Sequence, residues 1–142
     1  MDKMIFVNLP VSNLEQSMAF YAGIGAQNDA RFTDHSAAMM KFSDTIMVML
    51  LTHERFNGFT SRKIPNAHET AQMLLCLSEE SRDAVDATVD RAVASGGLGD
   101  PNPQQDYGFM YGRSFADPDG HIWEVAWMDV EAAMAAGAEN AA

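Results

Sequence analysis

Glu124 is the acidic residue whose setting in the sequence best suits chemistry. The turn before it, 118–120, combines a proline with a glycine, which predicts a tight hairpin with a bulge. Because side chains alternate along a strand, this hairpin would place Glu124 opposite Ser114, on a face that also carries Gly112 and Ala126. Such small residues favour a cavity, where a carboxylate must be paired, hydrogen-bonded or protonated. Glu124 could therefore act as a general base, or it could be a polar residue that Ser114 or water satisfies.

Three other side chains are candidates for binding a ligand. Strand alternation places Asn8 on the side of its strand that would face the cavity. Its side chain could orient a substrate carbonyl group or form a hydrogen bond to a strand edge. His53 ends a predicted strand and could face the cavity mouth or the solvent. Cys76 shares the cavity parity, but its apolar strand and the lack of a neighbouring cation predict an inert core thiol. The candidate ligand-binding residues are therefore Asn8, His53, Cys76, Ser114 and Glu124.

The elements that must position these residues occur in the same order twice. Each half of the chain predicts one strand, one helix and three further strands. In the first half the strands are 5–11, 27–32, 37–42 and 46–52, and the helix begins with Ser12 as its cap. In the second half the strands are 72–77, 98–103, 107–116 and 121–128, and either Ser78 or Ser81 caps the helix. Arg113 falls on the helix-facing side of its strand, which predicts a structural ion pair.

These elements suggest one domain over residues 1–129. We expect a first module at about 4–52, a linker at 53–70 and a second module at about 71–129. The tail at 130–142 is rich in alanine and predicts a short helix.

Composition excludes several classes of protein. The chain has 142 residues, with 9 basic and 20 acidic side chains and a net charge of −11 at pH 7. That charge argues against nucleic acids and anionic membrane surfaces as partners, although it would not repel a neutral or cationic ligand. The single cysteine rules out an internal disulfide. The N-terminus does not read as a signal peptide, and no apolar run approaches the ~20 residues of a membrane span, so we expect a cytoplasmic protein.

Two segments of the sequence resemble a known superfamily. Residues 117–124 resemble the signature at the last hairpin of glyoxalase I and the bleomycin-resistance proteins, and residues 8–17 with Phe20 and Tyr21 resemble their first strand and helix. The chain therefore resembles the vicinal-oxygen-chelate superfamily of glyoxalases, bleomycin-resistance proteins and extradiol dioxygenases, in particular a lactoylglutathione-lyase-like member. The resemblance implies an α+β fold in which two tandem β-α-β-β-β modules form a curved mixed sheet around a cleft. It also implies a homodimer.

The resemblance further implies four positions that would ligate a divalent metal. They are a His or Gln on the first strand, a Glu on the fourth, a His on the fifth and a Glu on the eighth. In this chain they fall on Phe6, Leu50, Leu74 and Glu124, and only Glu124 offers an oxygen ligand. Because a catalytic divalent site needs three or more protein ligands, we expect no intact metal site and no cofactor. A shifted divalent-metal site that uses Asn8, His53 or His68 is the alternative.

Three functional hypotheses follow. The first is a metal-independent protein that binds a small neutral or cationic molecule in the cleft, with Glu124 as its main polar group. The second is a lyase or isomerase of the glyoxalase type that uses Glu124 as the base. The third is a resistance protein that sequesters a basic drug such as bleomycin. Since this superfamily hosts many activities, the resemblance alone does not choose among them.

Overall fold

The computed structural model describes the backbone of residues 1–141 and the side chains of residues 1–137. The first module contains one helix and one four-stranded sheet. In chain order these are β1 (Ile5–Val11), α1 (Leu14–Gly23), β2 (Gln27–Asp29), β3 (Ala37–Lys41) and β4 (Ile46–Thr52), with a 3-10 turn at Ala30–Phe32. The strands lie in the order β1-β4-β3-β2, with β1 parallel to β4 and the other pairs antiparallel.

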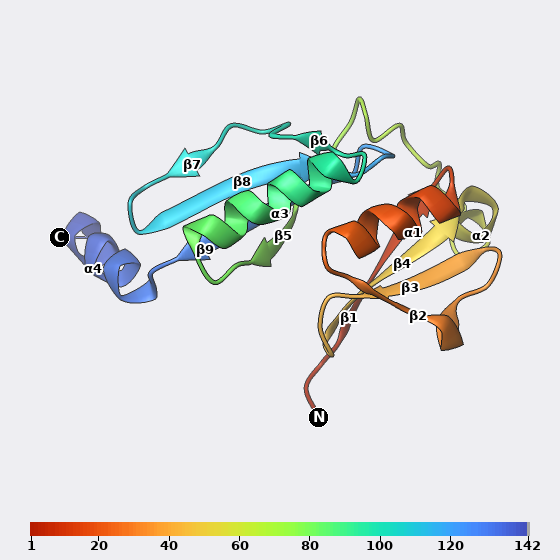
Figure 1. The fold of residues 1–142 in the computed structure, drawn as a ribbon, viewed down its shortest axis with the longest axis horizontal. Helices are drawn as coiled ribbons and strands as arrows, with labels where there is room; N and C mark the ends of the chain where they lie inside the picture. Colours follow the sequence, from red (N-terminus) through yellow and green to blue (C-terminus); the bar gives the residue numbers. More distant parts are fainter. Residues whose placement is uncertain (142) are drawn as a thin grey trace.

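The second module repeats this design. Its elements are β5 (Leu75–Ser78), α3 (Arg82–Ala94), β6 (Leu98–Gly99), β7 (Gln105–Asp106), β8 (Met110–Ala116) and β9 (Ile122–Met128). The order is β5-β9-β8-β6, and β7 pairs with another part of β8. The predicted α+β fold of two β-α-β-β-β modules is confirmed, with one mixed sheet in each module and the short strand β7 as an addition in the second (Figure 1).

The helix starts follow local capping chemistry. Asn13 caps α1 by accepting a hydrogen bond from the backbone N–H of Gln16 at 3.0 Å, so the prediction that Ser12 is the cap was wrong by one residue. The backbone N–H of Ser12 instead donates to Asp119 Oδ1 at 2.9 Å. Ser81 caps α3, which decides between the two serines considered for that position.

The linker contains a short helix that the sequence did not predict. This helix, α2 (His53–Asn57), is capped by Thr52, and an irregular segment then leads to β5. As a result β5 begins at Leu75, three residues later than predicted. The tail forms the predicted helix, α4 (Val130–Ala141). Among the described residues no helix is long and apolar enough to cross a membrane; the cytoplasmic location stays a prediction.

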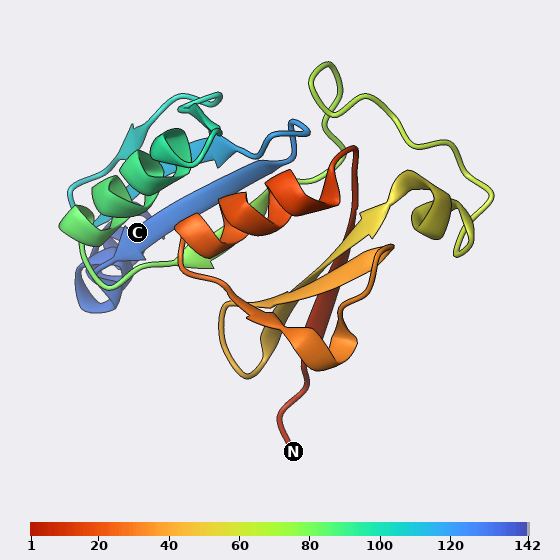
Figure 2. The ribbon, with the colours of Figure 1, turned by 45° about the vertical axis from the view of Figure 1, so that its right-hand side comes forward.

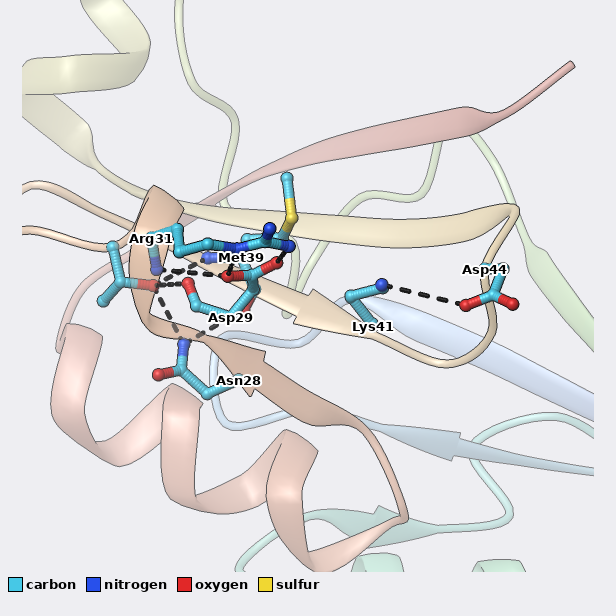
Figure 3. Close-up of polar contacts among 7 residues, drawn as sticks. Asn28, Asp29, Arg31, Met39, Lys41 and Asp44 are labelled. Carbon is cyan, nitrogen blue, oxygen red and sulfur yellow. Dashed lines mark hydrogen bonds and ion pairs between the residues drawn. The ribbon is translucent and has the colours of Figure 1, made fainter.

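The outer edge of the first sheet is closed by polar contacts (Figure 3). On β2, the Asn28 side chain donates a hydrogen bond to the Met39 carbonyl at 3.0 Å. Just after β2, the Arg31 guanidinium donates two hydrogen bonds to the Asp29 carboxylate, at 3.0 and 2.8 Å. The hydrogen bonds and the charge of Arg31 lower the pKa of Asp29 to about 2. A short edge strand with paired charges disfavours pairing with a strand of another chain. We therefore interpret these contacts as protection of the sheet edge.

One hydrophobic core serves both modules. Helix α1 lies beside β9 as well as over its own sheet (Figure 2), and it carries Phe20 and Tyr21 into the core. The ring centroid of Phe20 is 6.0 Å from that of Phe115, and the centroid of Tyr21 is 6.0 Å from that of Trp123. The first module's helix therefore packs against the second module's sheet, and the modules share buried apolar area.

The sheet faces that point away from the helices are less covered. On β1 and β9, Phe6 is 47% exposed and Met128 50% exposed, and Leu74, just before β5, is 48% exposed. Strand alternation puts Asn8, Cys76 and Glu124 on these same faces. The predicted polar site residues of the strands thus lie where a ligand or another chain can reach them.

Candidate functional site

The turn of the last hairpin is the joint between the two modules. Asp117, at its start, is 2% exposed, and its Oδ2 accepts a 2.7 Å hydrogen bond from the Tyr21 hydroxyl of α1. That hydroxyl in turn accepts the indole N–H of Trp123 at 3.0 Å. The other oxygen, Oδ1, accepts the backbone N–H groups of Asp119 and His121 at 3.0 and 2.9 Å. Burial raises the pKa of Asp117, and burial with the Asp117 charge raises that of Tyr21.

Gly120 lets the linker cross directly over this turn. It has a φ of +94°, as the predicted bulged turn requires. A Cβ at this position would lie 2.7 Å from the backbone carbon of Ala67 and 2.7 Å from the backbone nitrogen of His68. The absence of a side chain at Gly120 therefore sets how closely the linker approaches the last hairpin.

The predicted register of the last hairpin is confirmed. Ser114 pairs with Glu124 and Gly112 with Ala126 across β8 and β9. On the opposite face Arg113 donates to Asp100 at 2.6 Å and to Asp86 at 3.0 Å, as predicted for a structural ion pair. These carboxylates raise the pKa of Arg113 further, so it stays cationic.

Glu124 lies in a small groove on the open face of the second sheet. This Glu124 groove has a volume of about 50 Å³ and is lined by Cys76, Met110, Gly112, Ser114 and Ala126 among others. The Glu124 side chain is half-buried, and none of the hydrogen bonds among the described residues involves its carboxylate. The predicted partner, Ser114, is 1% exposed and accepts the backbone N–H of Asn102 at 3.0 Å instead. The expected Ser114–Glu124 hydrogen bond was therefore wrong, because the segment after β6 folds over the serine.

Cys76 lies beside Glu124 but is not a core residue. It pairs with Glu124 across β5 and β9, and it is exposed, so the predicted inert core position was wrong. The uncovered sheet face, which the sequence does not reveal, causes the difference. Partial desolvation and the Glu124 charge raise the pKa of the thiol, so Cys76 remains a weak nucleophile.

Asn8 and His53 lie apart from Glu124, at the seam between the modules. Asn8 lines a cavity of about 180 Å³, here named the seam cavity, with Pro10, Phe56, Met73, Leu75 and Ile122 among its other walls. His53 lines an adjoining cavity of about 350 Å³, named the histidine cavity, whose walls include His68, His121 and Asp119. The structure therefore divides the five predicted ligand-binding residues among three hollows.

The side chains at the four superfamily metal positions do not fit a divalent ion. Phe6 and Leu74 have no ligand atom, and Leu50 is fully buried in the core under α1. The register predicted at Leu50 was thus wrong by one residue, since Met49 is the residue that pairs with Asn8 on the open face. A thioether is a poor ligand for a hard divalent cation. Among the described residues, no group of three His, Cys, Asp or Glu side chains is arranged to hold a metal ion.

Sequence reasoning missed the residues that the linker brings to the seam. His68 and Phe56 come from the linker, whereas His121 comes from the last hairpin. His53, His68 and His121 are far apart in sequence, so no spacing pattern marks them as neighbours. The one usable signal was Gly120, whose positive φ belongs to the predicted bulged turn over which the linker crosses.

Comparison with known proteins agrees with this architecture. Residues 3–125 match the family model described as the Glyoxalase/Bleomycin resistance protein/Dioxygenase superfamily. The chain belongs to this superfamily. A search of curated proteins finds no match to the chain.

Several solved structures are similar to this chain in fold. A hypothetical protein from S. aureus has a TM-score of 0.74 at 21% identity, over 89% of this chain and 94% of that one. A glyoxalase-related enzyme from Fulvimarina pelagi has a TM-score of 0.74 at 22% identity, over 89% and 88% of the two chains. The fosfomycin resistance protein FosX from Mesorhizobium loti has a TM-score of 0.67 at 13% identity, over 94% and 98%. At these identities the likeness shows the fold alone.

The raised pKa of Asp117 gives a testable pH dependence of stability. The folded state holds this proton more tightly than the unfolded state, whose carboxyl titrates near the ordinary value of 3.8. As the pH rises above 3.8, the unfolded chain releases the proton first, so Asp117 lowers the free energy of unfolding until the pH passes its folded pKa. Asp117→Asn should lack this decline in urea-unfolding curves measured at increasing pH.

Asp44→Asn is the matched control, because the Asp44 carboxylate is fully exposed in a hairpin turn. Its curve should run parallel to that of the wild type over the same pH range. If the Asp117→Asn curve also runs parallel, the assignment is wrong. Titration of the Asp117 carboxyl carbon by NMR in the wild-type protein tests the same pKa without a substitution.

Proposed function

We propose that this superfamily member binds a small neutral or cationic molecule at the Glu124 groove, without a metal ion. The observation that carries the proposal is the half-buried Glu124 carboxylate, which has no hydrogen-bond donor among the described residues. A carboxylate in a partly apolar groove gains free energy from a donor or a positive charge. A ligand with an amine, amidine or hydroxyl group supplies either one.

Three other carboxylates of the second module are already paired with arginines, which supports this choice of residue. Asp86 and Asp100 bind Arg113, and Asp106 binds Arg82 at 2.8 Å. These ion pairs occupy the acids on the helix-facing side and around β7. The overall charge of −11 adds an attraction for cations at long range.

Metal independence is supported by the chemistry of the residues at the superfamily's ligand positions. Phe6, Met49 and Leu74 offer no nitrogen or oxygen, which leaves Glu124 alone. A glyoxalase-type reaction relies on a metal to stabilise the enediolate, and these residues do not provide for one. Binding is therefore the function that the site supports best.

We also propose that the protein is a homodimer in which a second copy covers the open sheet faces. Phe6, Leu74 and Met128 are each about half exposed on those faces. Exposed apolar side chains on a sheet face are typical of an interaction surface, and a symmetric pair of chains buries the same patch twice. The Glu124 groove is only about 50 Å³ in one chain, so a covering chain would deepen it.

Glu124→Gln tests the binding proposal. Benzylamine and benzyl alcohol, which differ by one charged group, are titrated into the wild type and the variant by calorimetry or NMR. We expect the substitution to weaken benzylamine binding about tenfold and to change benzyl alcohol binding little, because only the amine needs the carboxylate charge. Glu80→Gln is the control and should behave as the wild type, because Glu80 is an exposed acid just before α3.

Two results would contradict the binding proposal. One is equal benzylamine affinity in the wild type and Glu124→Gln. The other is stoichiometric nickel, zinc or iron in the purified protein that is lost on Glu124→Ala, because a bound metal would favour the enzyme hypothesis.

Phe6→Glu tests the dimer. A charge on the open face of β1 should reduce the mass measured by light scattering from twice the chain mass of 15.5 kDa to a single chain. Phe59→Glu is the control, since Phe59 is exposed in the linker. A wild-type protein that is monomeric at all concentrations, or a Phe6→Glu variant that stays dimeric, would show that this face is not the interface.

A further inference from the structure

The seam and histidine cavities adjoin at the junction of the two modules, away from Glu124. They share the walls Pro10, Pro65, Ala67 and His121. The seam cavity is mostly apolar, whereas the histidine cavity carries ionisable side chains. We propose that the two together form a second binding site, for a small carboxylic acid with an apolar body.

The seam cavity suits the apolar body. Its walls include Phe56 from α2, Met73 from the linker and Ile122 from β9. Its volume is about 180 Å³. An apolar cavity of roughly 150 Å³ is large enough to hold a benzene ring. One ring or a short alkyl chain is therefore the size that the cavity accepts, and the exposed Asn8 amide marks its polar rim.

The histidine cavity suits the carboxylate. Three of the chain's four histidines, His53, His68 and His121, line it. His121 Nε2 lies 2.8 Å from the Pro10 carbonyl oxygen, which can only accept, so Nε2 carries the hydrogen and the ring is held in place. No hydrogen bond among the described residues involves the rings of His53 or His68, and both residues are exposed. Protonated imidazoles make charge-assisted hydrogen bonds to a carboxylate.

The carboxylates near the histidine cavity already accept hydrogen bonds from other parts of the protein. Asp119 is the acid that lines the histidine cavity, and its Oδ1 accepts the backbone N–H of Ser12 at 2.9 Å. Its Oδ2 lies 3.5 Å from the Ser17 hydroxyl. Asp117 accepts the backbone N–H of His121, but it is buried beneath the turn. The one acid that lines the histidine cavity therefore has its two oxygens directed to Ser12 and Ser17 of the first module.

The backbone holds this arrangement in place. The linker backbone at Ala67 and His68 rests against Gly120, and the Asn66 side chain accepts the backbone N–H of His68 at 3.0 Å. His53 lies at the start of α2, which Thr52 caps. Local contacts therefore hold the backbone at His53 and His68 in place. The ring of His121 is held by its hydrogen bond to the Pro10 carbonyl.

Titration of the full-length protein with phenylacetate, and with 2-phenylethanol as its neutral counterpart, tests the site. Near pH 6 we expect phenylacetate to bind about tenfold more tightly than 2-phenylethanol, because only the acid offers a carboxylate to the imidazole N–H groups. In His53→Asn/His68→Asn the phenylacetate affinity near pH 6 should fall about fivefold or more.

Two controls separate this site from others. His35→Asn removes the histidine that lies outside the cavity and should bind phenylacetate as the wild type does. Glu124→Gln should also leave phenylacetate binding unchanged, so this inference and the proposed function can fail separately. Three results would overturn the inference. The first is equal affinity for phenylacetate and 2-phenylethanol near pH 6, and the second is an absence of saturable phenylacetate binding. The third is an equal loss of phenylacetate affinity in His35→Asn and in the double variant.

Discussion

The buried carboxylate of Asp117 is the contact on which the arrangement of the two modules depends. It accepts the Tyr21 hydroxyl of the first module at 2.7 Å and two backbone N–H groups of its own turn. Burying a carboxylate is costly, and these three hydrogen bonds offset that cost. Because the turn is fixed from within and tied to α1, it provides a firm surface for the linker at Gly120 and for the Pro10 carbonyl at His121.

The polar groups of the second sheet are divided between its two faces. On the helix-facing side Arg113 and its carboxylates satisfy one another at 2.6 and 3.0 Å. On the open side Glu124 has no donor among the described residues, and its neighbours are small or apolar. A carboxylate that has no protein donor at an accessible groove is free to accept a hydrogen bond from water or from a ligand. This contrast is the reason why we propose Glu124 for ligand binding and assign Arg113 to the fold.

The strand register at the last hairpin and the order of the elements could be predicted from the sequence, because short-range geometry determines both. The tight turn at Gly120 fixes the parity of β8 and β9, so the pairing of Ser114 with Glu124 was predictable. The repeated order of strands and helices likewise followed from apolar periodicity and glycine positions. Leu50 was misplaced by one residue, because the hairpin turn before β4 joins it to β3 and does not set its parity in relation to the parallel strand β1.

The remaining features depend on contacts between distant segments. Cys76 is exposed because no segment within the described part of the chain covers its sheet face. Ser114 accepts a hydrogen bond from Asn102, which lies in a loop whose path the sequence does not specify. The histidine cavity exists only because the linker rests on the last hairpin. These features depend on tertiary contacts, which strand alternation and helix-capping rules cannot predict.

The link between Tyr21 and Asp117 is the central claim, and a double-mutant cycle tests it most directly. The free energy of unfolding is measured by urea for the wild type, Tyr21→Phe, Asp117→Ala and the double variant. A direct hydrogen bond between the modules predicts that the effects of the two substitutions are not additive, with a coupling energy of about 1–3 kcal/mol. Additivity within about 0.5 kcal/mol would contradict the account.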